Sequence, residues 1–377
     1  MKIALIFALS LFYLPSECGE IKIGISYSNP PAKAEISCET KCVSGKNKFS
    51  RVIISARGQE LIAEYPDRTE KLKKALIESE GKLRISYFKK SRTYYGKIYI
   101  EPYKNSLKII NICDLEKYLE SVVSAEIRDL KNYEAYKAQA VIARTYTLVN
   151  IDRHKKSGFH ICDNTHCQLY NGYENISPKA AQAVKETEGE ILEYRGRPAW
   201  TFYHSICGGV TDSVWEIWPY EKKPYLRSVK DGPPVRPYCR NAPGFLWRTK
   251  IKFSKFEKFS QEKIFKAKLP LTGLSVSART QAGRAKTLKF VSGKYEKTIS
   301  VIDFYHIAGR YFGWEAIRSA MFDVSFEKFY VVFKGKGHGH GVGLCQHGAD
   351  AMAELGYDYN QILEHYYKDL KLVRRKL

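Results

Sequence analysis

The sequence predicts a mixed α+β fold, because strand-like and helix-like patterns occupy different stretches of the chain. Between residues 21 and 113, short runs rich in β-branched and aromatic residues alternate with polar loops, which is typical of strands. From Asp114 to Asn150, apolar residues recur at helical spacing instead. After residue 244, helical and strand patterns are mixed. A length of 377 residues allows one or two domains with a large core.

Residues 1–18 predict a secretory signal. Lys2 is followed by the apolar run IALIFALSLFYL, and the small residues Ser16 and Cys18 suit a signal-peptidase cleavage site. The run is too short for a comfortable membrane span. Lipidation of Cys18 is the less favoured alternative, because the residues before it make a poor lipidation motif. The sequence therefore predicts an exported protein of the periplasm or cell wall.

The formal net charge of +22 indicates an anionic partner. In a cytosolic protein this charge would first suggest nucleic acid. An exported chain meets anionic wall polymers and membrane surfaces instead, and attraction to them needs no specific site. We therefore expect cell-wall partners and peripheral membrane association, and no nucleic acid.

Residues 19–104 are expected to form a β-rich N-terminal region. The strand-like runs, the last of which extends to Cys113, are IKIGISY, RVIISARG, LRISYF, KIYIEPY and LKIINIC. Within this region, Cys38 and Cys42 favour a local disulfide over half of a metal site, because disulfides persist outside the cytoplasm. Cys207 and Cys239 are expected to form a longer-range disulfide.

The stretch from Asp114 to Asn150 predicts two helices joined by a short polar turn. Asp114 can cap the first helix. Glu126 falls in the apolar stripe of that helix, where burial would raise the pKa of its carboxyl group and suit it to general acid catalysis. In the alternative interpretation the stripe has ended and Glu126 pairs with a nearby Lys or Arg. Spacing alone favours this alternative.

The segment HKKSGFHICDNTHCQLYNGY predicts either a zinc site or a disulfide. Cys162, His166 and Cys167 are ligand types that tetrahedral zinc prefers, with His154 or His160 as the fourth. A disulfide between Cys162 and Cys167 is the alternative that an exported location favours. Both interpretations stay open at this point.

Several motifs together resemble the SpoIID/LytB family (sporulation stage II protein D and relatives). They are YLESVVSAEI, EAYKAQAVIARTY, HICDNTHCQLY, TFYHSICGGVT, RYFGWEAIRSAMF and GKGHGHGVGLCQHGADAMAELGYDYNQILEHYY. They occur in the family's order and extend from about Ile21 to the C-terminus. One departure is Arg128, where the family usually has Pro.

The resemblance implies a peptidoglycan lytic transglycosylase that cleaves MurNAc–GlcNAc β-1,4 bonds to 1,6-anhydroMurNAc products. Glu126 would be its catalytic residue, and the glycan strands would first have lost their stem peptides. Residues 105–377 would form a two-lobed catalytic domain with a central cleft and a lobe boundary near residues 232–244, which are rich in Pro. Zinc would be structural, with His154 as the fourth ligand, and catalysis would need no cofactor.

The resemblance also implies residues that contact the glycan. They are Lys137, Gln139, Arg144, Gln168, Tyr170, Tyr203, His204, Ser205, Gly208, Gly209, Thr211, His338, His340 and Gln346. For Arg144 the alternative is a salt bridge between the two helices, and for Tyr170 it is a core tyrosine. His338 and His340 could also share a metal ion from an extended strand.

Other functional classes are less well supported. A P-loop is excluded because no Lys-Ser/Thr follows the glycines of GKGHGHG. A serine hydrolase is excluded because no nucleophile-elbow motif surrounds Ser205. The main alternative is a noncatalytic wall protein that activates an N-acetylmuramoyl-L-alanine amidase. A weaker one is zinc-dependent hydrolysis at residues 154–167.

Overall fold

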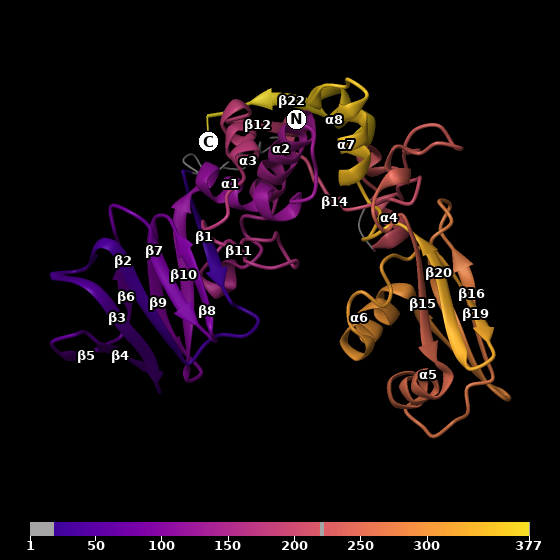
Figure 1. The fold of residues 1–377 in the computed structure, drawn as a ribbon, viewed down its shortest axis with the longest axis horizontal. Helices are drawn as coiled ribbons and strands as arrows, with labels where there is room; N and C mark the ends of the chain where they lie inside the picture. The colour runs from indigo at the N-terminus through magenta and orange to yellow at the C-terminus, as the bar shows by residue number, and fades with distance from the viewer. Residues whose placement is uncertain (1–18, 219–221, 377) are drawn as a thin grey trace, which may run out of the picture. The chain divides into compact units, whose positions relative to one another are not determined.

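A computed structural model describes residues 19–218 and 222–376 (Figure 1). The predicted signal segment, residues 1–18, lies outside the described residues. The fold is mixed α+β, as predicted, with strands before residue 114 and interspersed helices and strands after it. The chain forms two compact units, each described here by itself. Unit 1 draws on Met1–Glu126, Asn150–Ile176 and Arg374–Leu377, and unit 2 consists of Ile127–Val149 and Ser177–Val373.

Unit 1 contains two sheets, with strand orders β5-β4-β3-β2-β7-β8 and β11-β1-β10-β9-β6. Their strands are β1 (Glu20–Ile25), β2 (Lys33–Ser44), β3 (Asn47–Arg57), β4 (Glu60–Glu64), β5 (Thr69–Leu72), β6 (Ala75–Ile77), β7 (Leu83–Tyr87), β8 (Lys90–Tyr94), β9 (Lys97–Tyr103), β10 (Ser106–Asp114) and β11 (Ile161–Cys162). β3 and β4 of the first sheet contact β9 of the second. All five predicted strand runs are confirmed by β1, β3, β7, β9 and β10.

Alternating burial explains why these sequences form strands. Ile98 and Ile100 of β9 are fully buried, whereas Tyr99 between them is partly exposed. β10 pairs antiparallel with both β9 and β1, so it lies in the middle of its sheet. Its end leads directly into the helix α1 (Leu115–Glu126).

The helical part of unit 2 is built around α2 (Tyr133–Val149). The other helices are α3 (Pro178–Glu186), α4 (Val214–Ile217), α5 (Phe253–Phe259), α6 (Val301–Phe312), α7 (Gln346–Glu354) and α8 (Tyr359–Tyr366). α2 contacts α3, α7 and α8, although the last two come from the other end of the chain (Figure 1). Small residues permit this close packing, since Ala138, Ala140 and Ala143 are all fully buried.

The strands of unit 2 form four small sheets, with orders β13-β12-β22, β14-β21, β15-β20-β19 and β16-β17-β18. Their bounds are β12 (Glu190–Tyr194), β13 (Arg197–Pro198), β14 (Tyr203–His204), β15 (Leu246–Lys252), β16 (Gly273–Arg279), β17 (Ala285–Ser292), β18 (Tyr295–Ser300), β19 (Phe322–Glu327), β20 (Tyr330–Lys336), β21 (Leu344–Cys345) and β22 (Lys371–Arg374).

A cluster of phenylalanines holds α5 and α6 against these strands. Phe256 of α5 is fully buried, and its ring stacks parallel to those of Phe290 and Phe312. Phe304 of α6 and Phe333 of β20 are also fully buried in the same core. The apolar core of this part of unit 2 is therefore largely aromatic.

Two predicted boundaries can be placed on the structure. The boundary near residue 104 lies within unit 1, and the lobe boundary near residues 232–244 lies within unit 2. Among the helices of residues 19–218 and 222–376, none combines the length and the apolar character that crossing a membrane requires.

The aromatic core yields a prediction for stability. Phe256→Ala should lower the free energy of unfolding by about 3–5 kcal/mol, because it leaves a cavity among packed rings. Phe329 is 66% exposed, so Phe329→Ala is the matched control and should change it by less than about 0.5 kcal/mol. Urea unfolding of the three proteins measures both values. Equal losses for the two variants would contradict this assignment of the core.

Candidate functional site

α1 begins as the sequence predicts. The side chain of Asp114 accepts a hydrogen bond from the backbone N–H of Lys117 at 3.0 Å, which caps the helix. Leu119, Val122 and Val123 are fully buried and form its apolar face. One turn later, Glu126 ends the helix with a half-buried side chain.

A backbone amide holds the carboxylate of Glu126. The N–H of Leu169 donates to Glu126 Oε1 at 2.8 Å. A negative side chain at the C-terminal end of a helix gains nothing from the helix dipole, so the amide compensates locally. This contact fixes one carboxylate oxygen within unit 1.

Further contacts join α1 to residues 154–172, the cysteine–histidine loop. Tyr118 donates to Gln168 Oε1 at 3.2 Å, and Ser121 donates to the carbonyl of Gly172 at 2.5 Å. The hydroxyl of Tyr170 donates to Asn111 Oδ1 at 2.7 Å. Because Gln168 and Tyr170 are at most 1% exposed, both side chains belong to the core of unit 1. For Tyr170 this agrees with the alternative of a core tyrosine.

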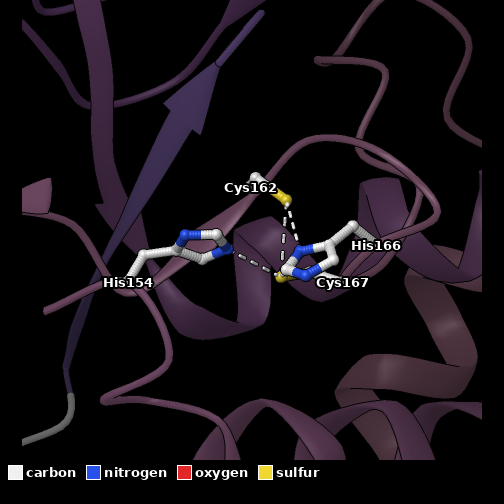
Figure 2. Close-up of side chains that lie close together, drawn as sticks. All are labelled: His154, Cys162, His166 and Cys167. Atoms are coloured by element: carbon white, nitrogen blue, oxygen red, sulfur yellow. Dashed lines mark hydrogen bonds between the residues drawn. The ribbon is translucent and has the colours of Figure 1, made fainter. Parts of the chain in front are cut away.

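The same loop brings together His154, Cys162, His166 and Cys167, whose ligand atoms all lie within 4.8 Å of one another (Figure 2). Cys162 lies on β11, which pairs with β1, and the ring of His154 stacks on Phe159. Cys167 Sγ is 3.4 Å from His154 Nε2 and 3.4 Å from Cys162 Sγ. Cys162 Sγ is 3.5 Å from His166 Nδ1.

These distances fit tetrahedral zinc. With bonds of about 2.3 Å to sulfur and about 2.0 Å to nitrogen, ligand atoms around zinc lie about 3.5–3.8 Å apart. A disulfide would need about 2.05 Å between the sulfurs, and Cys162 and Cys167 are both free thiols. His160 lies outside the cluster, because its Nδ1 accepts from the backbone N–H of Lys22 at 3.2 Å.

The two thiols differ in acidity. The pKa of Cys167 is lowered to about 7, chiefly because the Cys162 thiol donates a hydrogen bond to its sulfur. The same contact, together with burial, raises the pKa of Cys162. One of the two is thus readily available as a thiolate, the form that binds metal.

Three further predicted residues lie on α2 in unit 2. Lys137 forms ion pairs with Glu134 at 3.0 Å and Glu186 at 3.2 Å. Arg144 is fully buried and donates to the carbonyls of Val184 and Glu190, which links α2 to α3 and β12.

The third residue on α2 reaches the C-terminal motif. Gln139, 1% exposed, accepts from Gln346 Nε2 at 3.3 Å. Gln346 is the first residue of α7, and it is also buried. The structure therefore brings two of the residues predicted to contact glycan together within unit 2.

The motifs TFYHSICGGVT and GKGHGHGVGLCQHG lie side by side in unit 2. β14 and β21 pair in parallel, with Tyr203 opposite Leu344. His340 Nε2 lies 2.9 Å from the carbonyl of Tyr203, and its Nδ1 accepts from Val342 N at 3.0 Å. Burial lowers the pKa of His340 to about 4, so the ring is neutral and its two nitrogens bridge the two segments.

His204 is the second histidine of this pair. Its Nδ1 lies 3.1 Å from the carbonyl of Val342, and its pKa is lowered, first by burial. Among the described residues, its Nε2 has no hydrogen-bond partner. His338 is more accessible, with 39% of its side chain exposed.

The remaining predicted residues of this group shape the loop after β14. The carbonyl of Ser205 accepts from His347 N at 3.1 Å, and Thr211 Oγ1 accepts from Val229 N at 2.8 Å. Gly208 and Gly209 have φ of +79° and +109°, values that other residues rarely adopt.

A buried ion pair beneath this loop was not predicted from the sequence. Arg284 and Asp212 are each 1% exposed, and Arg284 Nη1 is 3.5 Å from Asp212 Oδ2. Arg284 also donates to the carbonyls of Cys207 and Val210 at 2.5 and 2.9 Å. Gly341 leaves room for the guanidinium group of Arg284, because a Cβ at position 341 would collide with that group. No local sequence pattern relates Asp212 to Arg284, so only the fold shows that they meet.

The predicted disulfides have different outcomes. The Cys38–Cys42 disulfide is confirmed. The predicted Cys207–Cys239 disulfide is wrong for this structure, because the two sulfurs lie 3.5 Å apart and both thiols are free. The physical reason is that a third thiol, Cys345, and the carboxylate of Asp231 share the same small space.

Comparison with known proteins identifies relatives of the chain. A family model described as Stage II sporulation protein (SpoIID) matches residues 103–194, which include the helix pair and the cysteine–histidine loop. An uncharacterized protein of Brachyspira hyodysenteriae is 29% identical over 86% of this chain and 86% of its own length. Stage II sporulation protein D of Bacillus amyloliquefaciens is 27% identical over 72% of this chain and 77% of its own length.

A further relative carries a different name. The amidase enhancer of Bacillus subtilis is 29% identical over 66% of this chain but only 39% of its own length. The family model and the relatives named stage II sporulation protein D agree with each other, and this similarity confirms the resemblance of the motifs to the SpoIID family.

The buried ion pair yields a prediction. Arg284→Gln should lower the free energy of unfolding by about 3–5 kcal/mol, because Asp212 would stay buried without its cation. Arg248 pairs with Glu327 on the surface, so Arg248→Gln should cost less than about 1 kcal/mol. Chemical denaturation compares the two variants. A loss below about 1 kcal/mol for Arg284→Gln would show that the pair does not support the loop.

Proposed function

We propose that the chain is an exported lytic transglycosylase of peptidoglycan, with Glu126 as its single acid/base group. The observation that carries this proposal is the half-buried carboxylate at the end of α1, held at one oxygen by the amide of Leu169. A fixed carboxylate in a partly apolar setting suits proton transfer. It lies within the segment that the SpoIID family model matches.

In the proposed reaction, Glu126 first protonates the glycosidic oxygen between MurNAc and GlcNAc as the bond to C1 breaks. The carboxylate then removes the proton from the C6 hydroxyl of MurNAc, whose oxygen closes on C1. The products are a 1,6-anhydroMurNAc end and a free 4-hydroxyl on GlcNAc. Because the substrate supplies the nucleophile, one carboxylate is enough, unlike the paired carboxylates of most glycoside hydrolases.

The glycan contacts are assigned to the two facing motifs of unit 2. His338 is the most accessible of the three histidines predicted to contact glycan, and it can meet a sugar hydroxyl. Gly208 and Gly209 can let backbone approach the glycan closely. The side chains of His340 and Arg144 form hydrogen bonds within unit 2, so their effect on glycan binding would be indirect. The proposal retains the central cleft of a two-lobed domain and a preference for strands without stem peptides.

The proposal includes a structural zinc ion bound by His154, Cys162, His166 and Cys167. The donor set and its spacing support this assignment over a disulfide. When bound, zinc would supply a rigid cross-link with no open position for chemistry. Two residues after Cys167, Leu169 contacts Glu126, so a stable loop keeps the amide in place.

A second candidate function rests on the similarity to an amidase enhancer. In this alternative the chain binds wall glycan and activates an N-acetylmuramoyl-L-alanine amidase without cleaving the strand itself. The net charge of +22 supports attraction to anionic wall polymers in either case.

The role of Glu126 can be tested directly. Glu126→Gln should leave the fold intact and reduce glycan cleavage by about 10²–10⁴-fold, because the amide cannot transfer the proton. The measurement is mass spectrometry of soluble products from amidase-treated peptidoglycan, with the wild-type chain releasing fragments that end in 1,6-anhydroMurNAc.

Glu120→Gln is the control on the same helix, because Glu120 forms a local ion pair with Lys117, and it should retain nearly full activity. Fragments with reducing ends would mean hydrolysis and a missing second catalytic group. Wall binding without fragments, together with stimulation of an added amidase, would replace the transglycosylase proposal with the alternative.

The metal proposal is tested by a pair of histidine variants. His154→Gln should remove the loop zinc and lower the cleavage rate at least about tenfold, because the loop that carries Leu169 loosens. His160→Gln should keep both the zinc ion and the cleavage rate, since the His160 ring accepts a hydrogen bond from a backbone amide and lies outside the cluster. Elemental analysis and the product assay report the two effects.

Chelation of the wild-type chain, compared with Glu126→Gln, tests for a catalytic metal. If chelation abolished cleavage while Glu126→Gln left it unchanged, zinc-dependent hydrolysis would be the correct assignment. Equal zinc contents in His154→Gln and His160→Gln would overturn the ligand set.

A further inference from the structure

Four buried groups from distant parts of unit 2 meet at one point. They are Cys207 after β14, Asp231 and Cys239 in the loop before β15, and Cys345 at the end of β21. Their ligand atoms all lie within 4.8 Å of one another, and each residue is at most 1% exposed. Three thiols and a carboxylate are an unusual content for a protein interior, where such groups are expected to have partners.

The spacing of the sulfurs fits a shared metal ion better than a disulfide. Cys207 Sγ and Cys239 Sγ are 3.5 Å apart, close to the edge of about 3.8 Å in a tetrahedron of thiolates around zinc. A disulfide between these two residues would also leave Cys345 as a lone thiol beside a buried carboxylate. A metal ion uses all four groups.

Backbone amides point at the sulfurs. The N–H of Cys207 donates to Cys345 Sγ at 3.2 Å, and the N–H of Gly348 donates to the same sulfur at 3.4 Å. The N–H of Gly209 donates to Cys207 Sγ at 3.3 Å. Such hydrogen bonds stabilise thiolates, which are the form that binds metal.

The carboxylate of Asp231 is also oriented. Its Oδ1 accepts from the hydroxyl of Tyr366 at 2.5 Å, and its Oδ2 accepts from the N–H of Cys239 at 2.9 Å. Gly348 makes room for this arrangement, because a Cβ there would collide with both Asp231 and Tyr366. A carboxylate held in this way matches the hydrogen-bonded carboxylates that surround metal ions.

A buried positive charge lies on one side of the cluster. Arg284 donates to the carbonyl of Cys207 and interacts electrostatically with Cys207 and Cys345. Arg284 is already paired with Asp212, so it cannot balance the negative charge that the three cysteines and Asp231 would carry as metal ligands. A divalent cation among the four ligand groups would balance much of the remaining negative charge.

We propose that Cys207, Asp231, Cys239 and Cys345 bind one zinc ion, at a site separate from the cysteine–histidine loop of unit 1. Four protein ligands leave no open position, so the site is structural and not catalytic. The ion would join three segments that contact each other over long sequence separations. It would thereby fix the loop after β14 to the start of α7, independently of any role for Glu126.

Zinc stoichiometry tests the proposal. The chain is produced in an oxidising compartment with zinc supplied, purified without chelator and analysed for metal. The wild-type chain should hold about two zinc ions, and a Cys162→Ser, Cys167→Ser double variant about one. Adding Cys345→Ser to that double variant should leave none. Cys113→Ser is the matched control, because Cys113 is buried but belongs to neither cluster.

A thiol map of the wild-type chain tests the proposal without any variant that could misfold. The wild-type chain is unfolded with chelator, alkylated without reductant and mapped by mass spectrometry. Alkylation of Cys207, Cys239 and Cys345 together supports the proposal. A Cys207–Cys239 cross-linked peptide overturns it, as does a double variant that folds but holds no zinc. If Cys345→Ser fails to fold, the zinc content of the double variant and this thiol map decide the question.

Discussion

The hydrogen bond from the Leu169 amide to Glu126 Oε1 joins the end of α1 to the loop that carries the cysteines and histidines. Every other feature of the candidate site in unit 1 supports this contact. Asp114 fixes the start of α1, Tyr118 and Ser121 attach its side to the loop, and β11 anchors the loop to β1. A carboxylate at the end of a helix would otherwise have many rotamers. Here one of its oxygens has a defined position, which general acid catalysis requires.

In unit 2, neighbouring residues hold glycine-rich segments in one conformation. The motifs around Gly208 and Gly341 have little side-chain bulk of their own, so neighbours must fix them. Arg284 does this with carbonyl contacts, and His340 does it with both ring nitrogens. Several residues expected to bind glycan therefore contribute first to the shape of the backbone. Substitutions at these positions would change binding through that shape.

Sequence reasoning predicted the local structure well and the long-range structure poorly. The helix pair, its Asp114 cap and five strands follow from periodicity and capping, which act over a few residues. The α6 helix could have been found in the same way, since Ser300 accepts from the N–H of Asp303 as an N-cap. The burial of Tyr170 and the meeting of Asp231 with three cysteines could not, because no spacing rule relates residues that the fold alone brings together. The resemblance implied His154 as the fourth ligand, and only the structure shows that the ring of His160 faces a backbone amide instead.

The assembly of α2 has a consequence for folding kinetics. Its partners are made long after it, because Gln139 contacts Gln346 and Glu134 contacts Tyr359, separations of 207 and 225 residues. Closing loops of this length is entropically costly and slow, so α2 must wait for the C-terminal segment before its buried polar groups are satisfied. In a nascent chain that still lacks α7 and α8, the small-residue faces of α2 would be exposed to solvent. Folding of unit 2 is thus expected to be post-translational.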